Sequence, residues 1–440
     1  MEQQQSECES PAGGLDGSGL HIALVHWAFP PSVGGVETHL WEYSRALARR
    51  NHRVTIFTGT ADSRPPCSGV DVFYHPLLDL SVDRVDSDAS VRQLSEWFAD
   101  HLTAGGQAVR LVHGHNLHHF SNVPALALDS LRGRLGLVLP HTYHSIWRDP
   151  DNEKLARECA VWDAHHAVSD FLVHECSEVL TELKEPVTRT YLGIDASTYL
   201  DVGPLEQNDN RPVILLPARL IPNKGAVVAV EMLAELIERA KKSARALRPR
   251  LVLTNPGDTV DFHDEAWGFK ERLLDLMKRR DLESDDVEFR AAGIDDMRGL
   301  YEEASVVIYP SRFNEPMGLA PLEAMCAARP VVATGIGGLG EGGSALVEFQ
   351  ERDDEPALVQ RFADEVWQLL MDPAEARAAG LRGREHVQKH FDLEEVYVDQ
   401  MLTEYQRLLD GAPQSDMTRQ PSGSSVNAHS PEVVTATDSR

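Results

Sequence analysis

The chain has 440 residues, 42% hydrophobic and 25% charged, an ordinary composition for a soluble globular protein of two or three domains. Its formal net charge of −27 argues against a nucleic-acid-binding protein and weakens non-specific adhesion to anionic membranes. The cysteines, 5 in number, show no CxxC spacing, so neither a disulfide framework nor a zinc site is indicated.

Both ends of the chain are polar. Residues 1–18 and 411–440 are predicted to be disordered. The N-terminus lacks the charged and apolar regions of a signal peptide, and no stretch approaches the roughly eighteen apolar residues of a membrane-spanning helix. We therefore predict a cytoplasmic protein with no integral membrane segment. The basic run from Arg239 to Arg250 could touch an anionic membrane surface, although a solvated helix face is the favoured interpretation.

The first half of the sequence alternates apolar runs with amphipathic segments, as α/β folds do. Apolar residues recur at helical spacing from Val36 to Leu47, directly after the glycine pair Gly34 and Gly35. Strands are expected at 20–26, 53–59, 71–77, 109–115, 135–139, 165–168 and 187–193, and helices at 36–50 and 91–103.

Histidines gather after two of these expected strands. The strand at 109–115 ends in a cluster that contains His113 and His115. No Cys or carboxylate completes a metal-ligand set, so crevice lining with acceptor contacts is favoured over zinc binding. The strand at 135–139 runs into Pro-His-Thr-Tyr-His-Ser, which places His141 and His144 at its end.

The second half follows a polar linker at 201–211. Arg219 and Lys224 lie in the loop after a strand at 213–216. Two cations there can neutralise a departing diphosphate, with Arg suited to bidentate contact and Lys acting as a point charge. Ordinary surface charges are the alternative. Strands are also expected at 251–254, 287–291 and 345–349, a turn at 255–258, and helices at 226–239, 262–282, 357–371, 374–390 and 393–409.

Residues 306–338 carry the densest group of candidate ligands. A strand at 305–309, a loop, a helix from Leu319 and a strand at 330–334 are expected in this order. The helix N-terminus would present the free amides of Gly318, Leu319 and Ala320 to phosphate. Glu315 and Glu323 flank that position and would accept hydrogen bonds from a sugar and a ribose. For either carboxylate alone, helix-dipole complementation or a solvated surface position is the simpler interpretation.

The segment Glu-Pro-Met-Gly-Leu-Ala-Pro-Leu-Glu is a Glu-x7-Glu motif. With Tyr-Pro-Ser before it and Pro-Val-Val-Ala-Thr-Gly-Ile-Gly-Gly after it, it resembles the donor-site signature of glycosyltransferase family 4. These are retaining nucleotide-sugar transferases of the GT-B fold, an α/β architecture in which two Rossmann-like parallel-sheet domains face each other across a cleft. The resemblance implies an acceptor-side domain over 19–203, a nucleotide-sugar domain over 204–392, and a helix at 393–410 that crosses back to the first domain.

The resemblance also implies a reaction and its residues. A hexosyl group would move from a nucleotide diphosphate sugar to a hydroxyl acceptor. A UDP-sugar is the first guess for the donor. No cofactor or essential metal is expected, because Arg219 and Lys224 supply positive charge. The implied catalytic residues are His141, with His144 as second candidate, Glu315, Arg219 and Lys224. The implied donor ligands are Gly34, Gly35, Arg219, Lys224, Glu315, Met317, Gly318, Leu319, Ala320 and Glu323, and the acceptor-side candidates are His113, His115 and His144.

The sequence departs from the family pattern at three places. Leu192-Gly193 stands where the family usually has Asn-Gly, and Ala327-Ala328-Arg329 replaces a segment that usually contains Gly. Asn255-Pro256-Gly257-Asp258 stands where the family more often has a turn similar to Gly-Asp-Gly. Two other functions stay open: another nucleotide-sugar-processing enzyme of the same fold, such as an epimerase or a phosphorylase, and a non-catalytic nucleotide-sugar binder. Three acceptor classes stay open: a small metabolite, a lipid and a polysaccharide.

Overall fold

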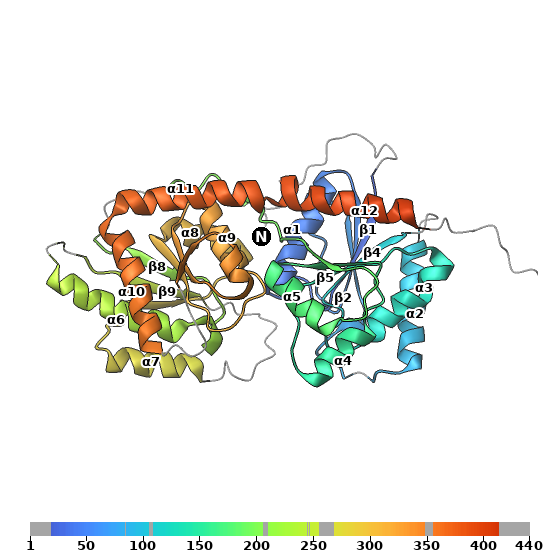
Figure 1. The fold of residues 1–440 in the computed structure, drawn as a ribbon, viewed down its shortest axis with the longest axis horizontal. Helices are drawn as coiled ribbons and strands as arrows, with labels where there is room; N and C mark the ends of the chain where they lie inside the picture. Colours follow the sequence, from blue (N-terminus) through green and yellow to red (C-terminus); the bar gives the residue numbers. More distant parts are fainter. Residues whose placement is uncertain are drawn as a thin grey trace, which may run out of the picture.

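Two α/β domains lie side by side in the computed structural model (Figure 1). It describes residues 19–412 apart from 84, 105–108, 206–209, 244, 246, 255–267 and 348–354. The expectations for residues 1–18, for the turn at 255–258 and for nearly all of the C-terminal tail lie outside the described residues.

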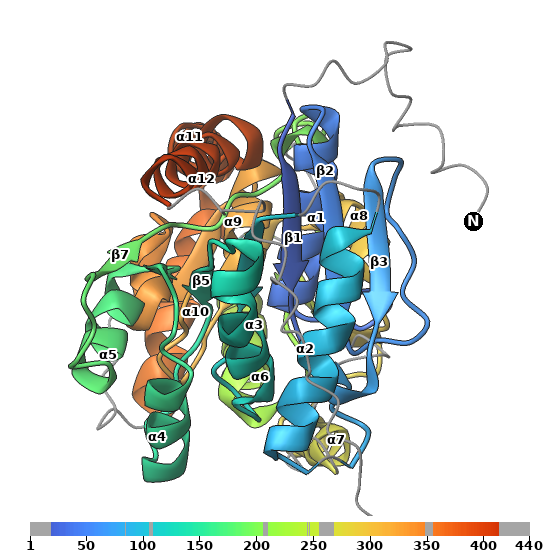
Figure 2. The same cartoon turned by 90° about the vertical axis from the view of Figure 1, so that its right-hand side faces the viewer.

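The first domain is built on seven parallel strands in the order β3-β2-β1-β4-β5-β6-β7. Helices α2 and α3 pack side by side on one face (Figure 2), while α1, α5 and α12 contribute to the core on the other. The strands are β1 His21–Val25, β2 Arg53–Thr58, β3 Val70–Tyr74, β4 Leu111–His115, β5 Pro140–Tyr143, β6 Ala164–Ala167 and β7 Val187–Arg189. The helices are α1 Gly35–Arg49, α2 Asp88–Thr103, α3 Val123–Leu135, α4 Pro150–Glu158 and α5 Asp170–Val179.

The second domain has six parallel strands in the order β10-β9-β8-β11-β12-β13, and its apolar residues form one continuous core. The strands are β8 Val213–Leu216, β9 Arg250–Thr254, β10 Val287–Arg290, β11 Val306–Tyr309, β12 Val331–Thr334 and β13 Ala345–Val347. The helices are α6 Ala226–Lys242, α7 Phe269–Arg279, α8 Met297–Glu303, α9 Leu319–Cys326, α10 Glu355–Met371 and α11 Pro373–His390.

The strand order reverses once in each sheet. The first sheet turns between β1 and β4, and the second between β8 and β11. Ligands of open parallel sheets bind outside the carboxyl ends of the strands at such switch points. The loops after β1, β4, β8 and β11 are therefore the segments that the topology presents for binding.

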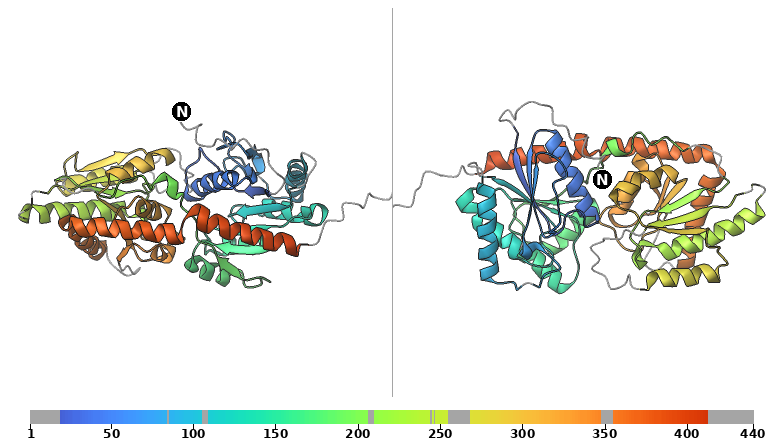
Figure 3. Two further views of the ribbon diagram at one scale, coloured as in Figure 1. Left: turned by 90° about the horizontal axis from the view of Figure 1, so that it is seen from above. Right: turned by 180° about the vertical axis from the view of Figure 1, so that it is seen from behind.

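The end of the chain crosses from the second domain to the first. Helix α11, a π-helical segment over Leu393–Val398 and α12 Asp399–Gly411 run in succession across both domains (Figure 3). At the crossing, the amide of Ile194 donates to the carbonyl of Phe391 at 2.7 Å. Gly193 lies here so tightly that a Cβ would be 2.4 Å from Cα of Leu393. Packing at the crossing therefore requires glycine at position 193.

The strand expected at 135–139 is wrong in position. Leu135 is the last residue of α3, and Gly136 ends that helix in the left-handed conformation, with φ of 62°. Only Val138 of the expected strand bridges to β4, and regular pairing begins at residue 140. A short apolar run can end a buried helix as well as form a strand, which is why the sequence pattern misplaced this element.

The second departure from the family pattern has a visible backbone consequence. Ala328 lies in the left-handed region with φ of 54°, where residues other than glycine are strained. Its carbonyl packs against α11, because a Cβ on Gly380 would lie 2.1 Å from that oxygen. The turn is therefore held in a strained conformation by the helix packed over it.

Relief of this strain can be measured with two glycine variants. Ala328→Gly removes the strain. Ala327→Gly also removes a buried methyl group, but residue 327 has φ of −73°, so this substitution relieves no strain. We expect Ala328→Gly to be about 1–2 kcal/mol more stable than Ala327→Gly. Urea unfolding of both variants checks this, and equal stabilities would contradict a strained Ala328.

Candidate functional site

A buried ion pair joins the loops after β8 and β11. Nζ of Lys224 donates to Oε1 and Oε2 of Glu315 at 2.6 and 2.8 Å, and the two residues are only 8% and 3% exposed. Burial alone lowers the pKa of Lys224, but the charges and hydrogen bonds of Glu315 and Tyr309 together outweigh burial, so the net shift is upward. The two residues are 91 positions apart in the sequence, and the fold places them in direct contact.

Neighbouring residues supply further hydrogen bonds to this pair. The hydroxyl of Ser311 donates to Oε1 of Glu315 at 2.8 Å, and Nζ of Lys224 also donates to the hydroxyl of Tyr309 at 3.3 Å. The ring of Phe313 lies 4.8 Å from the ammonium. Arg219 is half-buried and close enough to Tyr309 to influence the pKa of that phenol. The structure thus brings Arg219, Lys224 and Glu315 together.

The N-terminus of α9 lies at the boundary between the domains. Leu319 and Met317 pack against the hydrophobic cores of both domains. A Cβ on Gly35, in the glycine pair of the first domain, would lie 3.7 Å from Cδ1 of Leu319. At Gly318 a Cβ would lie 2.5 Å from Cδ1 of Leu339, so any other residue would force that buried side chain to shift. The glycine pair of the first domain therefore lies against the start of α9 in the second domain.

Glu323 lies one turn into α9 and is held by a tyrosine. The hydroxyl of Tyr301 donates to Oε2 of Glu323 at 2.7 Å. Burial raises the pKa of Glu323, and the Tyr301 hydrogen bond opposes part of that rise. Glu42, from α1 of the first domain, faces the same region. Burial, and then the charges of Glu323 and Asp195, raise its pKa to about 8. Two carboxylates thus approach each other from opposite domains.

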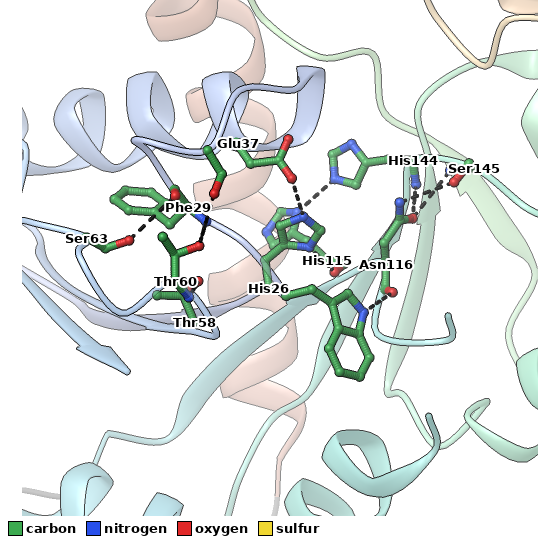
Figure 4. Close-up of polar contacts among 12 residues, drawn as sticks. His26, Phe29, Glu37, Thr58, Thr60, Ser63, His115, Asn116, His144 and Ser145 are labelled. Carbon is green, nitrogen blue, oxygen red and sulfur yellow. Dashed lines mark hydrogen bonds and ion pairs between the residues drawn. The ribbon is translucent and has the colours of Figure 1, made fainter. Parts of the chain in front are cut away.

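A second polar network lies in the first domain, at the carboxyl ends of β1, β4 and β5 (Figure 4). Nε2 of His144 and Nδ1 of His115 share a hydrogen bond of 3.0 Å. The side-chain oxygen of Asn116 accepts from the amides of His144 and Ser145 at 2.7 and 3.3 Å. These contacts fix the turn that carries His144.

The same network reaches the glycine pair through β1. Nδ1 of His26 donates to the carbonyl of His115 at 2.8 Å, and its Nε2 lies 3.3 Å from Oε1 of Glu37 (Figure 4). The other carboxylate oxygen of Glu37 would lie 2.2 Å from a Cβ on Gly34. Gly34 therefore leaves room for a buried carboxylate that is hydrogen-bonded to His26.

His141, the favoured catalytic candidate from the sequence, lies elsewhere. It is fully buried within β5, where Nε2 accepts from the amide of Leu117 at 3.1 Å and the ring stacks on Trp162. Its ring is enclosed by core residues because the strand begins later than expected, which places His141 inside the sheet. His144 lies at the strand end instead. His113 is also fully buried, between Tyr405 and Thr142.

The domains are joined by a carboxylate that the sequence analysis missed. Glu341 of the second domain accepts hydrogen bonds from the amides of Asp170 and Phe171 at the start of α5, both at 2.8 Å, and from the hydroxyl of Tyr191 at 2.9 Å. A carboxylate at a helix N-terminus is stabilised by the free amides and by the helix dipole. No local sequence signal could reveal it, because the cap comes from the other domain.

Three further sequence-based interpretations concern metal ligands, membrane-spanning helices and the basic run. Within them, no group of three or more His, Cys, Asp or Glu side chains is arranged to hold a metal ion. No helix in the described ranges is both long and apolar enough to cross a bilayer. In the basic run, Arg239 lies on α6 and pairs with Asp364, as expected for a helix face. Arg248 and Arg250 lie beyond the end of α6 and pair with Asp286 and Glu288, so the run is a helix face only in part.

Two family models match the chain. The one described as Glycosyltransferase Family 4 matches residues 33–198, and the one described as Glycosyl transferases group 1 matches residues 211–372. An α-maltose-1-phosphate synthase of Mycolicibacterium smegmatis is 34% identical over 419 residues, 84% of this chain and 95% of that protein. A glycogen synthase of Mycobacterium tuberculosis is 28% identical over 433 residues, 86% of this chain and 92% of that protein.

Solved structures share the fold. A glycosyltransferase from Rickettsia africae matches with a TM-score of 0.68 at 18% identity, over 90% of this chain and 100% of that chain. Anabaena HepE in complex with UDP-glucose matches with a TM-score of 0.64 at 18% identity, over 88% of this chain and 100% of that chain. The expected GT-B fold is confirmed.

The buried ion pair predicts strong energetic coupling between its partners. Lys224→Met or Glu315→Gln alone leaves one charge buried without its partner, at a cost of about 3 kcal/mol, or roughly 6–12 °C in melting temperature. The double variant buries neither charge, so it is expected to recover much of the loss. Melting curves of the three variants test this, and simple addition of the two losses would contradict the coupling.

The raised pKa of Glu42 predicts a pH-dependent stability difference. A carboxyl whose folded pKa exceeds its unfolded value stabilises the fold at low pH and loses that contribution as the pH rises, here from about 4.5 to about 8. Glu42→Gln removes this loss, so its melting temperature should rise relative to the parent protein between about pH 5 and pH 8. Glu178→Gln, on an exposed part of α5, is the control. A constant difference would contradict the shifted pKa.

Proposed function

This chain belongs to the glycosyltransferases of group 1 and family 4, and from that membership we propose that it transfers a hexosyl group from a nucleoside-diphosphate sugar to a hydroxyl acceptor. A UDP-sugar is the first candidate donor, in keeping with the UDP-glucose bound to HepE. We also propose that the anomeric configuration is retained and that no metal ion is required.

The observation that carries the proposal is the buried Lys224–Glu315 pair, whose glutamate lies in the loop that leads directly into α9. A diphosphate there would accept hydrogen bonds from the amides of residues 318–320 and would lie near the positive charges of Arg219 and Lys224. Glu323, already oriented by Tyr301, would accept from the ribose hydroxyls. Glu315 would accept from hydroxyls of the donor sugar.

The first domain would close over the sugar. His144 is the histidine we assign to the sugar, in place of the fully buried His141, because it lies at the end of β5 beside the glycine-loop network. Gly34 and Gly35 would let the backbone approach the donor closely. Closure of the two domains excludes water, which would otherwise intercept the activated sugar.

The chemistry requires no protein nucleophile. The bond from the anomeric carbon to the phosphate oxygen breaks, and the acceptor oxygen bonds to the same face of that carbon. The acceptor proton passes to the departing phosphate. Arg219, Lys224 and the α9 amides stabilise the negative charge that develops on the diphosphate, which is the largest contribution expected from the protein.

Donor hydrolysis without acceptor tests the proposal. The purified protein is incubated with UDP-, GDP- and ADP-sugars in the presence of EDTA, and the released nucleoside diphosphate is measured. We expect one nucleotide to be released, at a rate about 100-fold lower in Glu315→Gln, since a charged donor ligand is lost. Glu271→Gln, on the exposed side of α7, is the matched control and should retain the parent rate.

The alternatives give different results in the same assay. An epimerase would convert the nucleotide sugar without releasing nucleotide, and a non-catalytic binder would show donor binding without turnover. Loss of activity in EDTA that added metal restores would contradict metal independence. Once an acceptor is identified, an inverted anomeric configuration in the product would contradict retention.

A further inference from the structure

The histidine that hydrogen-bonds to His144 cannot itself reach a ligand. His115 is 0% exposed and lies under His144, at the end of β4. The sequence suggested that His115 contacts the acceptor, but its ring is closed off from the cleft. Figure 4 shows its ring directed toward His144, with which it shares the 3.0 Å hydrogen bond. Any effect of His115 on the reaction must therefore pass through His144.

This hydrogen bond couples the tautomers of the two rings. A neutral imidazole has one N–H, so one ring must donate and the other accept. If Nε2 of His144 donates, its Nδ1 is a pure acceptor; if Nδ1 of His115 donates, Nδ1 of His144 carries the proton. Among the described residues, Nδ1 of His144 has no hydrogen-bond partner although it is buried, so it keeps one unused hydrogen-bonding position for a ligand that enters beside it. Its role as donor or acceptor is set by His115.

We infer that His115 is a positioning residue, which fixes the tautomer and orientation of His144 through their shared hydrogen bond. This inference rests on the proposed function, in which His144 contacts the donor sugar. It replaces the expected acceptor contact of His115 with a role in holding another residue. Buried partners that hydrogen-bond a functional histidine generally fix its ring in this way.

His115 is itself firmly held. Its carbonyl accepts from Nδ1 of His26, and its ring lies over the ring of His113, with centroids 4.1 Å apart. His113 is fixed from both sides, because Nδ1 contacts the hydroxyl of Tyr405 at 2.6 Å and Nε2 contacts the hydroxyl of Thr142 at 2.9 Å. Tyr405 belongs to α12. The helix that returns from the second domain thus supports the ring beneath His144.

The surroundings also keep His144 uncharged. Burial and then the neighbouring histidines lower its pKa well below the usual range, and the same causes act on His115. The groups that face this pair are His39 from α1, the His26–Glu37 contact at the end of β1, His113 from β4 and His118 from the loop after it. A neutral ring adds no positive charge beside a sugar that itself becomes positively charged in the transition state.

Two nearly isosteric substitutions separate this role from simple packing. Asn at position 115 keeps a polar atom close to the position of Nδ1, whereas Leu has a similar shape and no hydrogen bond. Each variant is assayed for release of UDP from UDP-glucose, or of the nucleotide from the donor that the panel identifies, across about pH 5.5–8. His165→Leu is the control, since His165 is a buried histidine of β6 that bonds Tyr143 and lies outside the proposed site.

We expect His115→Leu to lower kcat by about 10- to 100-fold with little change in KM for the donor, and His115→Asn to recover most of that loss. Burial and histidines other than His115 lower the pKa of His144, so the pH profile of kcat should keep its shape in both variants while its height changes.

Several results would overturn the inference. One is an active parent protein with a His115→Leu variant that matches His165→Leu in kcat. Another is an equal loss in the Asn and Leu variants that follows only their melting temperatures. An inactive parent protein would instead contradict the proposed function, so the two failures are distinguishable.

Discussion

The buried ion pair between Lys224 and Glu315 ties together the two loops on which the second domain builds its site. Two charges withdrawn from water are tolerated only when each is paired and hydrogen-bonded, as Ser311 and Tyr309 ensure here. The pair therefore fixes the spacing of the loops at the switch point of the sheet. In the function we propose, a cation and a carboxylate held this way would receive a ligand with a diphosphate at one end and hydroxyls at the other.

Contacts between the domains place the two halves of the site opposite each other. Glu341 caps α5 from across the boundary, Gly35 lies against Leu319, and α12 carries Tyr405 back beneath the histidines. The first two contacts involve the N-termini of α5, α1 and α9, and the third joins α12 to β4. The polar contacts use charges and amides that water could also satisfy, so they can form and break as the cleft closes and opens.

Elements that depend on neighbouring residues could be predicted from the sequence. Contacts between residues far apart in the sequence could not. The strand-loop-helix around Glu315 and Gly318 was predictable, because strand, helix-start and glycine signals all lie within some thirty residues. The pairing of Lys224 with Glu315, and the cap supplied by Glu341, depend on how separate strands assemble. The choice between His141 and His144 depended on a strand boundary, and a shift of a few residues moved His141 into the core.

The most direct measurement is a crystal structure of the protein with UDP-glucose or UDP bound. A donor site at the switch point of the second domain predicts phosphate oxygens within hydrogen-bonding distance of the amides at residues 318–320 and of Nζ of Lys224. It also predicts the ribose on Glu323 and, in the UDP-glucose complex, the sugar between Glu315 and His144. A nucleotide bound away from Lys224 and the start of α9 would contradict this placement.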